Sequence, residues 1–386
     1  MRRSTMLNQE DLEILDDFVT TRNLQISSKR MYKNAINRYV ESQGTHLKEM
    51  LQEAETEEEE GIRLKNRTLK KRLIKHRNYL INEKNYSTVT LKKAMTMIRT
   101  IYHHYEIEIP KIPKLNEKNV KKYEEIYYDD LPSKELIAEA ISISKPLIKS
   151  IILFICSSGC ARKEVMSLTI GDFMEATCEY HNSTDVYDFI NELKDQDNIV
   201  PTFKLKRNKV NKYYYTFCSP EAVTAITSYL NSRTDNMTRE SKLFNIHINY
   251  LSVRFARLNR QLGGYKKGAY NIMRMHMLRK FHASNLARGE NGLTLDEIDS
   301  LQGRTKDSVQ SSYFYDDPKE LKKKYIKNMD KVMINVDMKT LTIDSPEVLE
   351  LKKKAMELEK ENEEIKQNIN KTVDERITEV LEKYGF

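Results

Sequence analysis

The amino-acid sequence predicts a mainly α-helical protein of two domains, with a small antiparallel β-hairpin in the second domain and a helical C-terminal tail. The chain has 386 residues, more than one typical domain, and its hydrophobic content of 39% is low but adequate for a core. Apolar residues recur every three or four positions in most segments, which is typical of amphipathic helices. One segment, residues 199–217, alternates with a period of two instead, and this predicts the hairpin.

The first domain, residues 1–113, is expected to contain several helices. The stretch "SSKRMYKNAINRYVESQG" begins with a serine that can cap a helix, and "NYSTVTLKKAMTMIRTIYHHY" has a similar cap at Ser87 or Thr88. In both stretches the apolar residues follow helical spacing. Between them, "EAETEEEEG" predicts an acidic surface segment or loop. Basic residues lie on the polar faces of the two helices, among them Lys29, Arg30, Lys33, Lys92, Lys93 and Arg99.

A segment with two prolines, Pro110 and Pro113, breaks the helical pattern and predicts a linker between the domains. The second domain, residues 114–335, is expected to be mainly helical. Its segment "PLIKSIILFICSSG" is almost wholly apolar on one side, so this helix should be central to a core. In "PTFKLKRNKVNKYYYTF", Phe203 and Leu205 alternate with lysines, and a similar alternation follows the basic turn. These residues predict the two-stranded hairpin.

The C-terminal tail, residues 336–386, has a different pattern. From Pro346 onward, apolar residues and one asparagine alternate four and three positions apart: Leu351, Ala355, Leu358, Asn362, Ile365 and Ile369. The spacing predicts a short coiled-coil seam, in which Asn362 at a core position would specify register and the number of strands. A single amphipathic helix packed on its own domain accounts for the pattern equally well.

Composition and charge narrow the classes of function. Lys and Arg number 65 against 57 Asp and Glu, and the net charge of +8 favours nucleic-acid binding without deciding it. The four cysteines lack metal-binding spacing, so buried, reduced thiols are expected. The N-terminus has no apolar region of a signal peptide, and the longest apolar run, "IILFIC", is too short to span a bilayer. We therefore expect a soluble cytoplasmic protein without a metal or nucleotide cofactor.

Four segments of the second domain carry polar residues that a purely structural helix would not need. In "HMLRKFHASNL", His276 and Arg279 are three residues apart on one helical face. In "SSGCARKEVMSLTIGDF", a long apolar helix breaks at Gly159, and Arg162 begins the next helix. The basic hairpin turn "KRNKVNK" is the third segment. In the fourth, "LQGRTKDSVQSSYFYDD", a turn at Arg304 precedes a short helix that ends in two tyrosines.

This ordered set of residues resembles the tyrosine recombinase (phage integrase) family. The family's box reads roughly H-x-L-R-H/K-x-x-A-S, and "HMLRKFHAS" matches it, with a tyrosine about 35 residues later. The segment "STVTLKKAMTMIRTIYHHY" is similar to the last helices of the family's helical core-binding domain, which would make the second domain the catalytic domain. The resemblance covers about residues 10–330. At residues 302–304 the chain reads "QGR", and this variant of the family's motif resembles integrases of archaeal viruses and mobile elements more than bacterial ones.

The resemblance implies that Arg162 and Arg279 clamp the scissile phosphate of DNA. Two guanidiniums can neutralise the non-bridging oxygens and stabilise the added charge of the pentacoordinate transition state. Arg162 lies one position later, relative to Gly159, than in the family's pattern T-G-L-R-x-S-E, and Lys163 is its rival. Arg304 stands where the family usually has His or Trp. It can donate a hydrogen bond to a phosphate oxygen, but it cannot act as an acid or base.

In the same family the nucleophile is a tyrosine, generally nine residues after the His or Trp position. That residue is Tyr313, and Tyr315, eleven residues after the same position, is interpreted as its neighbour. A phenol, with a pKa of about 10, can be activated by nearby positive charge and by His276. Lys209 best matches the family's hairpin lysine, which protonates the leaving 5′ oxygen, and Lys206 is the alternative. The product would be a 3′-phosphotyrosyl bond, made without metal or nucleotide.

The predicted function is therefore site-specific recombination or integration, with double-stranded DNA attachment sites as the partner and a location at the nucleoid. The resemblance implies a tetramer on DNA, and residues 346–384 are expected to contact a neighbouring copy. The six basic residues named in the first domain are expected to contact DNA phosphates. Two alternatives remain: a type IB-like topoisomerase, which uses similar groups, and a non-catalytic DNA-binding architectural protein with a decayed site.

Overall fold

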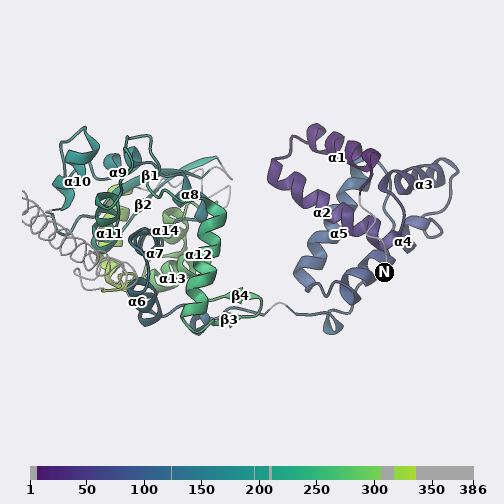
Figure 1. Cartoon of the computed structure of the whole chain (residues 1–386). Coiled ribbons are helices and arrows are strands. Elements are labelled where there is room, and N and C mark those ends of the chain that lie inside the picture. Colours follow the sequence, from purple (N-terminus) through teal and green to yellow (C-terminus); the bar gives the residue numbers. More distant parts are fainter. Residues whose placement is uncertain (1–6, 123, 195, 208–210, 306–316, 336–386) are drawn as a thin grey trace, which may run out of the picture. The chain divides into compact units, whose positions relative to one another are not determined.

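Figure 1 shows the computed structural model of the chain, which describes residues 7–122, 124–194, 196–207, 211–305 and 317–335. These residues are mainly helical and form two short antiparallel hairpins, which confirms the predicted mainly α fold with a small antiparallel sheet. The chain divides into two compact units, Met1–Glu125 and Ile126–Phe386. The predicted helical tail, residues 336–386, lies outside the described residues.

The division between the units falls after Glu125, later than the expected boundary at residue 113. Val120 is only 5% exposed and belongs to the hydrophobic core of the first unit. In the same unit the Thr88 amide donates to the carbonyl of Lys121 (3.2 Å). The segment that follows the two prolines therefore packs on the first unit, and the joint between the units lies further along the chain.

Residues 7–122 form a helical bundle. Its elements are α1 (Gln9–Thr21), α2 (Ile26–Gln43), α3 (Leu47–Glu59), α4 (Thr68–Asn82), α5 (Thr88–His104) and the 3₁₀ helix η1 (Glu117–Asn119). Asn8 begins α1 with a capping box, in which its side chain accepts from the Asp11 amide (2.8 Å) and the Asp11 carboxylate accepts from the Asn8 amide. The acidic stretch expected as a surface segment or loop mostly belongs to α3, because Leu47, Met50, Leu51 and Ala54 on its other face are buried.

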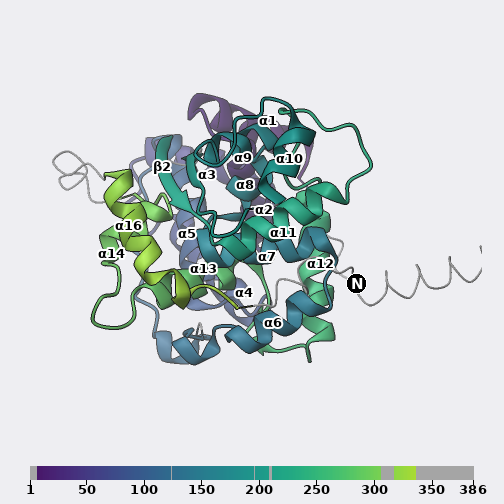
Figure 2. The same cartoon turned by 90° about the vertical axis from the view of Figure 1, so that its left-hand side faces the viewer.

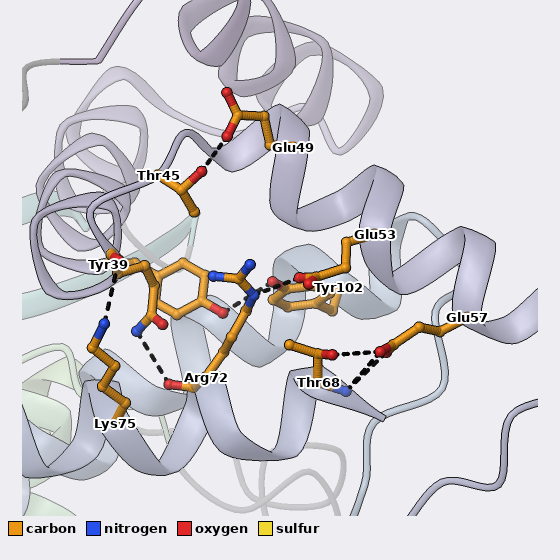
Figure 3. A network of polar contacts seen from close by, with 10 residues as sticks. Tyr39, Thr45, Glu49, Glu53, Glu57, Thr68, Arg72, Lys75 and Tyr102 are labelled. Atoms are coloured by element: carbon orange, nitrogen blue, oxygen red, sulfur yellow. Dashed lines mark hydrogen bonds and ion pairs between the residues drawn. The ribbon is translucent and has the colours of Figure 1, made fainter. Parts of the chain in front are cut away.

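A polar network joins the helices of this first unit (Figure 3). The hydroxyls of Tyr39 on α2 and Tyr102 on α5 lie 3.0 Å apart, and both side chains are fully buried. Burial raises the pKa of both phenols well above the usual value, so each stays protonated and one donates to the other. Close by, Arg72 Nε on α4 donates to Glu53 of α3 (2.6 Å). Four helices are thus linked by polar contacts as well as by apolar packing.

His76 of α4 is buried beside the same network, with 1% of its surface exposed. Its Nδ1 lies 2.8 Å from the hydroxyl of Ser42, and that hydroxyl donates its own proton to the carbonyl of Tyr39 (2.7 Å). The proton of the neutral imidazole must therefore be on Nδ1, pointing at the serine oxygen. Burial lowers the pKa of His76 to about 4, so the ring is neutral at pH 7.

The second unit is built around helix α7 (Pro146–Ser158), nearly all of which is buried. The other elements are α6 (Lys134–Ser142), α8 (Arg162–Ser167), α9 (Ile170–Ala176), α10 (Val186–Lys194), β1 (Thr202–Arg207), β2 (Lys212–Phe217), α11 (Pro220–Asn231), α12 (Ile248–Gln261), β3 (Lys266–Lys267), β4 (Tyr270–Asn271), α13 (Met275–Leu286), α14 (Leu295–Leu301), α16 (Pro318–Asn328) and the 3₁₀ helices η2 (Tyr128–Asp130) and η3 (Met329–Lys331). Helix α7 packs against both α11 and α13 (Figure 2). The sequence prediction of a central helix here is confirmed.

The predicted hairpin is also confirmed. Strands β1 and β2 pair antiparallel, from Thr202 opposite Phe217 to Arg207 opposite Lys212. The second hairpin, β3 with β4, was not predicted, because two residues per strand are too few to show a period of two.

The described chain ends beside a buried carboxylate. Glu221, the second residue of α11, is 3% exposed and accepts hydrogen bonds from the backbone amides of Ile334 (2.7 Å) and Asn335 (3.1 Å). The polypeptide that leads into the tail therefore starts from a fixed point on the second unit.

Three of the four cysteines, Cys156, Cys160 and Cys218, are buried free thiols, as expected, whereas Cys178 is exposed. Among the described residues no group of three His, Cys, Asp or Glu side chains is arranged to hold a metal ion. In the same part of the chain, no helix combines the length and the apolar character that crossing a membrane requires.

We predict that acid destabilises the first unit through His76. Between an ordinary histidine pKa near 6.5 and the folded value of about 4, the unfolded chain binds a proton that the folded chain does not. Lowering the pH through this window should remove about 3 kcal/mol of stability. Urea denaturation followed by circular dichroism at several pH values should show a weaker pH dependence for His76→Phe than for the unsubstituted chain. The exposed His103 is the control, and an unchanged slope in His76→Phe would contradict the assignment.

Candidate active site

The His-x-x-Arg segment forms the first turns of α13, and its arginine is held by two backbone carbonyls. Arg279 is only 6% exposed. Its Nη1 donates to the carbonyl oxygen of Gly159 (2.5 Å), at the end of α7, and its Nη2 donates to that of Gln302 (2.8 Å), just after α14. Three helix ends that are far apart in the sequence therefore converge on one guanidinium.

Gly159 permits this approach because it lacks a side chain. It ends α7 in the left-handed conformation, with φ of 64°. A Cβ atom there would lie 2.5 Å from His282 Nδ1 and 2.9 Å from Gln302 Nε2. Any larger residue would push the turn, and with it the carbonyl that Arg279 uses, away from α13.

Beneath Arg279, two buried side chains fix the relation of α13 to α14. The amide nitrogen of Gln302 donates to the backbone carbonyl of Arg279 (3.1 Å) and lies 3.0 Å from His282 Nδ1. Burial, helped by the charges of Arg279 and Arg304, lowers the pKa of His282 to about 3, so this ring is neutral. Since Nδ1 faces an amide NH₂ group, it is the acceptor, and the proton is on Nε2.

The hairpin brings a second guanidinium to the same place. Arg207 is the last residue of β1, and its Nη1 donates to the carbonyls of Gly303 (2.7 Å) and Gln302 (3.2 Å). Side chains alternate along a strand, so Lys206 lies on the opposite face, where its amine is 5.6 Å from the centroid of the exposed Tyr213 ring. Lys209, the preferred hairpin lysine, lies outside the described residues.

The electrostatic field of this cluster is strongly positive. Partial burial of His276 lowers its pKa, and the charges of Arg274, Lys280, Arg279 and Arg304 lower it further, so the imidazole is neutral near pH 7. A neutral imidazole can accept a proton, which is what a general base requires.

The turn after α14 places Arg304 next to the cluster but pairs it with an acid. Its Nη1 lies 3.1 Å from a carboxylate oxygen of Asp299, and its backbone amide donates to the carbonyl of the same residue (2.8 Å). Arg304 contributes to the lowered pKa values of His276, Arg279 and His282, so its charge is felt by all three. We use the term candidate site for Arg207, His276, Arg279, Gln302 and Arg304.

Arg162 is the first residue of α8 and is exposed, and its Nη1 donates to the hydroxyl of Ser252 on α12 (3.1 Å). Lys163 beside it is also exposed. No contact between Arg162 and Arg279 is seen within the described part of the chain. Tyr313 and Tyr315 lie outside that part, so the positions of both phenols stay predictions.

The six basic residues expected to contact DNA lie at the surface of the first unit, on α2 and α5. Two of them form ion pairs: Lys29 with Asp16 (2.5 Å) and Lys92 with Glu117 (2.6 Å). The other four are exposed, namely Arg30, Lys33, Lys93 and Arg99.

Sequence reasoning missed Arg207, Gln302 and His282 as members or supports of this cluster. A signal was available only for Arg207. The alternation that assigns Phe203 and Leu205 to the buried face assigns Arg207 to it as well. For Gln302, which is fully buried directly before the Gly-Arg turn, no sequence pattern indicated burial, because burial is decided by packing.

No protein-family model and no curated protein matches this chain. The solved structures to which it is similar include recombinases and integrases. XerA recombinase is 18% identical, over 82% of this chain and 97% of XerA, with a TM-score of 0.34. XerH site-specific recombinase, in a pre-cleavage complex with its difH substrate, is 15% identical over 83% and 90%, with a TM-score of 0.48. A lambda integrase dimer bound to a COC′ core site is 13% identical over 81% and 99%, with a TM-score of 0.44.

We predict that Gly159→Ala is much more destabilising than Gly44→Ala. Both glycines have positive φ, and the strain of an alanine there is about 1–2 kcal/mol. A Cβ at Gly44 meets nothing within 4 Å, whereas at Gly159 it meets His282 and Gln302, which should add about 1–3 kcal/mol of overpacking. Thermal unfolding measures the difference, and equal melting temperatures for the two variants would show that this turn can relax.

Proposed function

We propose that the chain is a tyrosine site-specific recombinase that cuts and rejoins duplex DNA. The observation that carries the proposal is the burial of the Arg279 guanidinium with neutral protein partners. It is a buried guanidinium whose protein partners are two neutral carbonyls, and among the described residues it forms no ion pair. A buried charge without a counter-ion is costly, unless the counter-ion is the ligand. A DNA phosphate supplies that negative charge.

The reaction assigned to the site is a transesterification at phosphorus. The phenol oxygen of Tyr313 attacks the scissile phosphate, the bond from phosphorus to the 5′ oxygen breaks, and a 3′-phosphotyrosyl bond forms. His276, neutral near pH 7, accepts the phenol proton, and Lys209 on the hairpin turn gives a proton to the leaving oxygen. A 5′-hydroxyl of a second duplex then reverses the step. The number of bonds to phosphorus is unchanged, so the step needs no ATP, and the arginines are proposed to supply the positive charge that a metal would otherwise provide.

The remaining cations have supporting roles in this proposal. Arg162 joins Arg279 on the non-bridging oxygens, and its exposed position on α8 leaves it accessible to a large ligand. Arg304 adds positive charge but no acid–base function, because a guanidinium stays protonated. The six basic residues of α2 and α5 contact the DNA backbone, so binding should weaken steeply as the salt concentration rises.

Recombination requires four active sites on two duplexes, and we therefore propose that the chain assembles as a tetramer on DNA. Residues 346–384 supply the contact between neighbouring copies, through coiled-coil pairing or helix docking. The hydrogen bonds that Glu221 accepts from the backbone amides of Ile334 and Asn335 support this role, because they fix the chain just before the tail.

The nucleophile can be identified with a nicked duplex that traps the covalent adduct. We predict that the unsubstituted chain forms an adduct on DNA that flanks its gene, that Tyr313→Phe abolishes it and that Tyr315→Phe does not. Gel electrophoresis and peptide mapping of the adduct give the measurement. Arg279→Ala should slow adduct formation by about 10²–10³, the usual effect of removing one donor to a developing oxyanion.

The alternatives predict different results. A type IB-like topoisomerase would form the adduct and relax supercoiled DNA without joining two duplexes. A non-catalytic binding protein would retain DNA but form no adduct under any condition, and that result would overturn the recombinase proposal.

Removing the tail should separate cleavage from recombination. A chain that ends at residue 345 keeps Ile334 and Asn335 on Glu221, so its fold should be intact. We predict normal adduct formation on the nicked duplex but about a hundredfold less joining of two duplexes, because the contacts that assemble the four sites are lost. Recombination at the full rate would show that the tail has another role.

A further inference from the structure

Arg207 is a cation of the candidate site that lies in the basic hairpin segment, where the sequence motifs drew attention to Lys209 and Lys206 instead. It lies on the same face of β1 as Phe203 and Leu205, which are 1% and 7% exposed. Arg207 is the last residue on this face, at the point where the strand leaves the core, and its side chain points toward the end of α14. There Nη1 of Arg207 donates to the carbonyls of Gly303 (2.7 Å) and Gln302 (3.2 Å). The guanidinium is thus held in place by backbone atoms.

Two guanidiniums share one of these acceptors. The carbonyl oxygen of Gln302 accepts from Arg279 Nη2 (2.8 Å) and from Arg207 Nη1 (3.2 Å), so the two positive groups meet at a single atom. Burial is the largest cause of the lowered pKa of Arg279, and the charge of Arg207 lowers it further. Within the described ranges neither arginine has a carboxylate partner. Two like charges held together in this way repel each other. An anion bound to both guanidiniums would attract each of them and offset this repulsion.

Most of the hydrogen-bonding capacity of Arg207 is not used by these contacts. A guanidinium has five N–H groups. In the part of the chain that the structure describes, only Nη1 of Arg207 has a protein acceptor, which leaves Nε and Nη2 able to present two parallel donors. This fork matches the two non-bridging oxygens of a phosphate.

We propose that Arg207 binds the scissile phosphate together with Arg279. The inference rests on the proposed recombinase function and adds a phosphate ligand from the hairpin to the residues that the motifs supply. In this arrangement Arg279 reaches the phosphate from α13 and Arg207 from β1, and the Gln302 carbonyl sets the spacing between the two guanidiniums. Arg207 has no part in proton transfer, and it acts by neutralising charge on the phosphate as the fifth bond to phosphorus forms.

The rival interpretation is that Arg207 only braces the turn at Gly303. A brace and a phosphate ligand respond differently to the charge of the substrate. Loss of a brace displaces the turn whatever DNA is bound. Loss of a phosphate ligand matters only while the phosphate carries its negative charge. A methylphosphonate, in which a methyl group replaces one non-bridging oxygen, removes that charge and keeps the leaving group.

The experiment compares Arg207→Gln with the unsubstituted chain on two nicked duplexes, one with a phosphate and one with a methylphosphonate at the scissile position. On the phosphate duplex we expect adduct formation to slow by about a hundredfold, whereas on the methylphosphonate duplex the two proteins should agree to within about threefold. Arg207→Lys should recover part of the loss, since it restores the charge but not the fork.

Lys204→Gln is the matched control. It removes one positive charge from the same strand, but on the opposite face, where the Lys204 amine lies 5.8 Å from the centroid of the Tyr213 ring. Any effect of this control should be equal on the two duplexes. The proposal is overturned if Arg207→Gln cleaves the phosphate duplex at the normal rate. It is also overturned if the variant is equally slow on both duplexes, which is the behaviour of a brace.

A second measurement keeps this inference separate from the recombinase proposal. Inorganic phosphate at constant ionic strength should raise the melting temperature of the full chain by binding the folded state. The rise should be smaller in Arg207→Gln and unchanged in Lys204→Gln. If the unsubstituted chain forms no adduct but shows this difference, the recombinase proposal fails and the phosphate site remains. If phosphate stabilises all three proteins equally, Arg207 does not bind it.

Discussion

The hydrogen bonds from Arg279 to the carbonyls of Gly159 and Gln302 are the contacts on which the rest of the candidate site depends. They join the end of the most buried helix, α7, to the end of α14 through a side chain of α13. Because Gly159 is packed against His282 and Gln302, the turn has almost no freedom to move. The position of the guanidinium is therefore decided by the hydrophobic core.

The same contacts explain why the cluster keeps its charge. Carbonyl oxygens stabilise a guanidinium without neutralising it, and among the described residues Arg279 forms no ion pair. Arg207 and Arg304 add to the field, and of these two arginines Arg304 is the one with an acidic partner among the described residues, Asp299. The first unit is different in this respect, because Arg72 in its polar network is paired with Glu53. Arg72 is thus paired with a carboxylate, whereas the partners of the buried Arg279 within the described ranges are neutral carbonyls.

Several features follow from the sequence because they depend on local pattern. The central helix, the hairpin and the turn at Gly159 each have a signal within about ten residues: a continuous apolar run, a period of two, or a glycine at a helix end. The box on α13 has a spacing that places His276 and Arg279 near each other whenever the segment is helical. The short second hairpin and the packing of residues 114–121 on the first unit had no such signal.

What the sequence determined by itself is thus the identity of the elements, the order of the motifs along the chain and the spacing within each motif. Only the tertiary structure decided which side chains meet. The alternation of β1 gives Arg207 and Lys206 opposite faces, but the packing of the hairpin on α14 decides that Arg207 is the one beside Gln302. Arg162 follows the expected break, yet its hydrogen bond is to Ser252 on α12. The physical reason is that contacts between residues more than a hundred positions apart, such as Arg279 with Gly159, come from the packing of whole helices, which no local pattern contains.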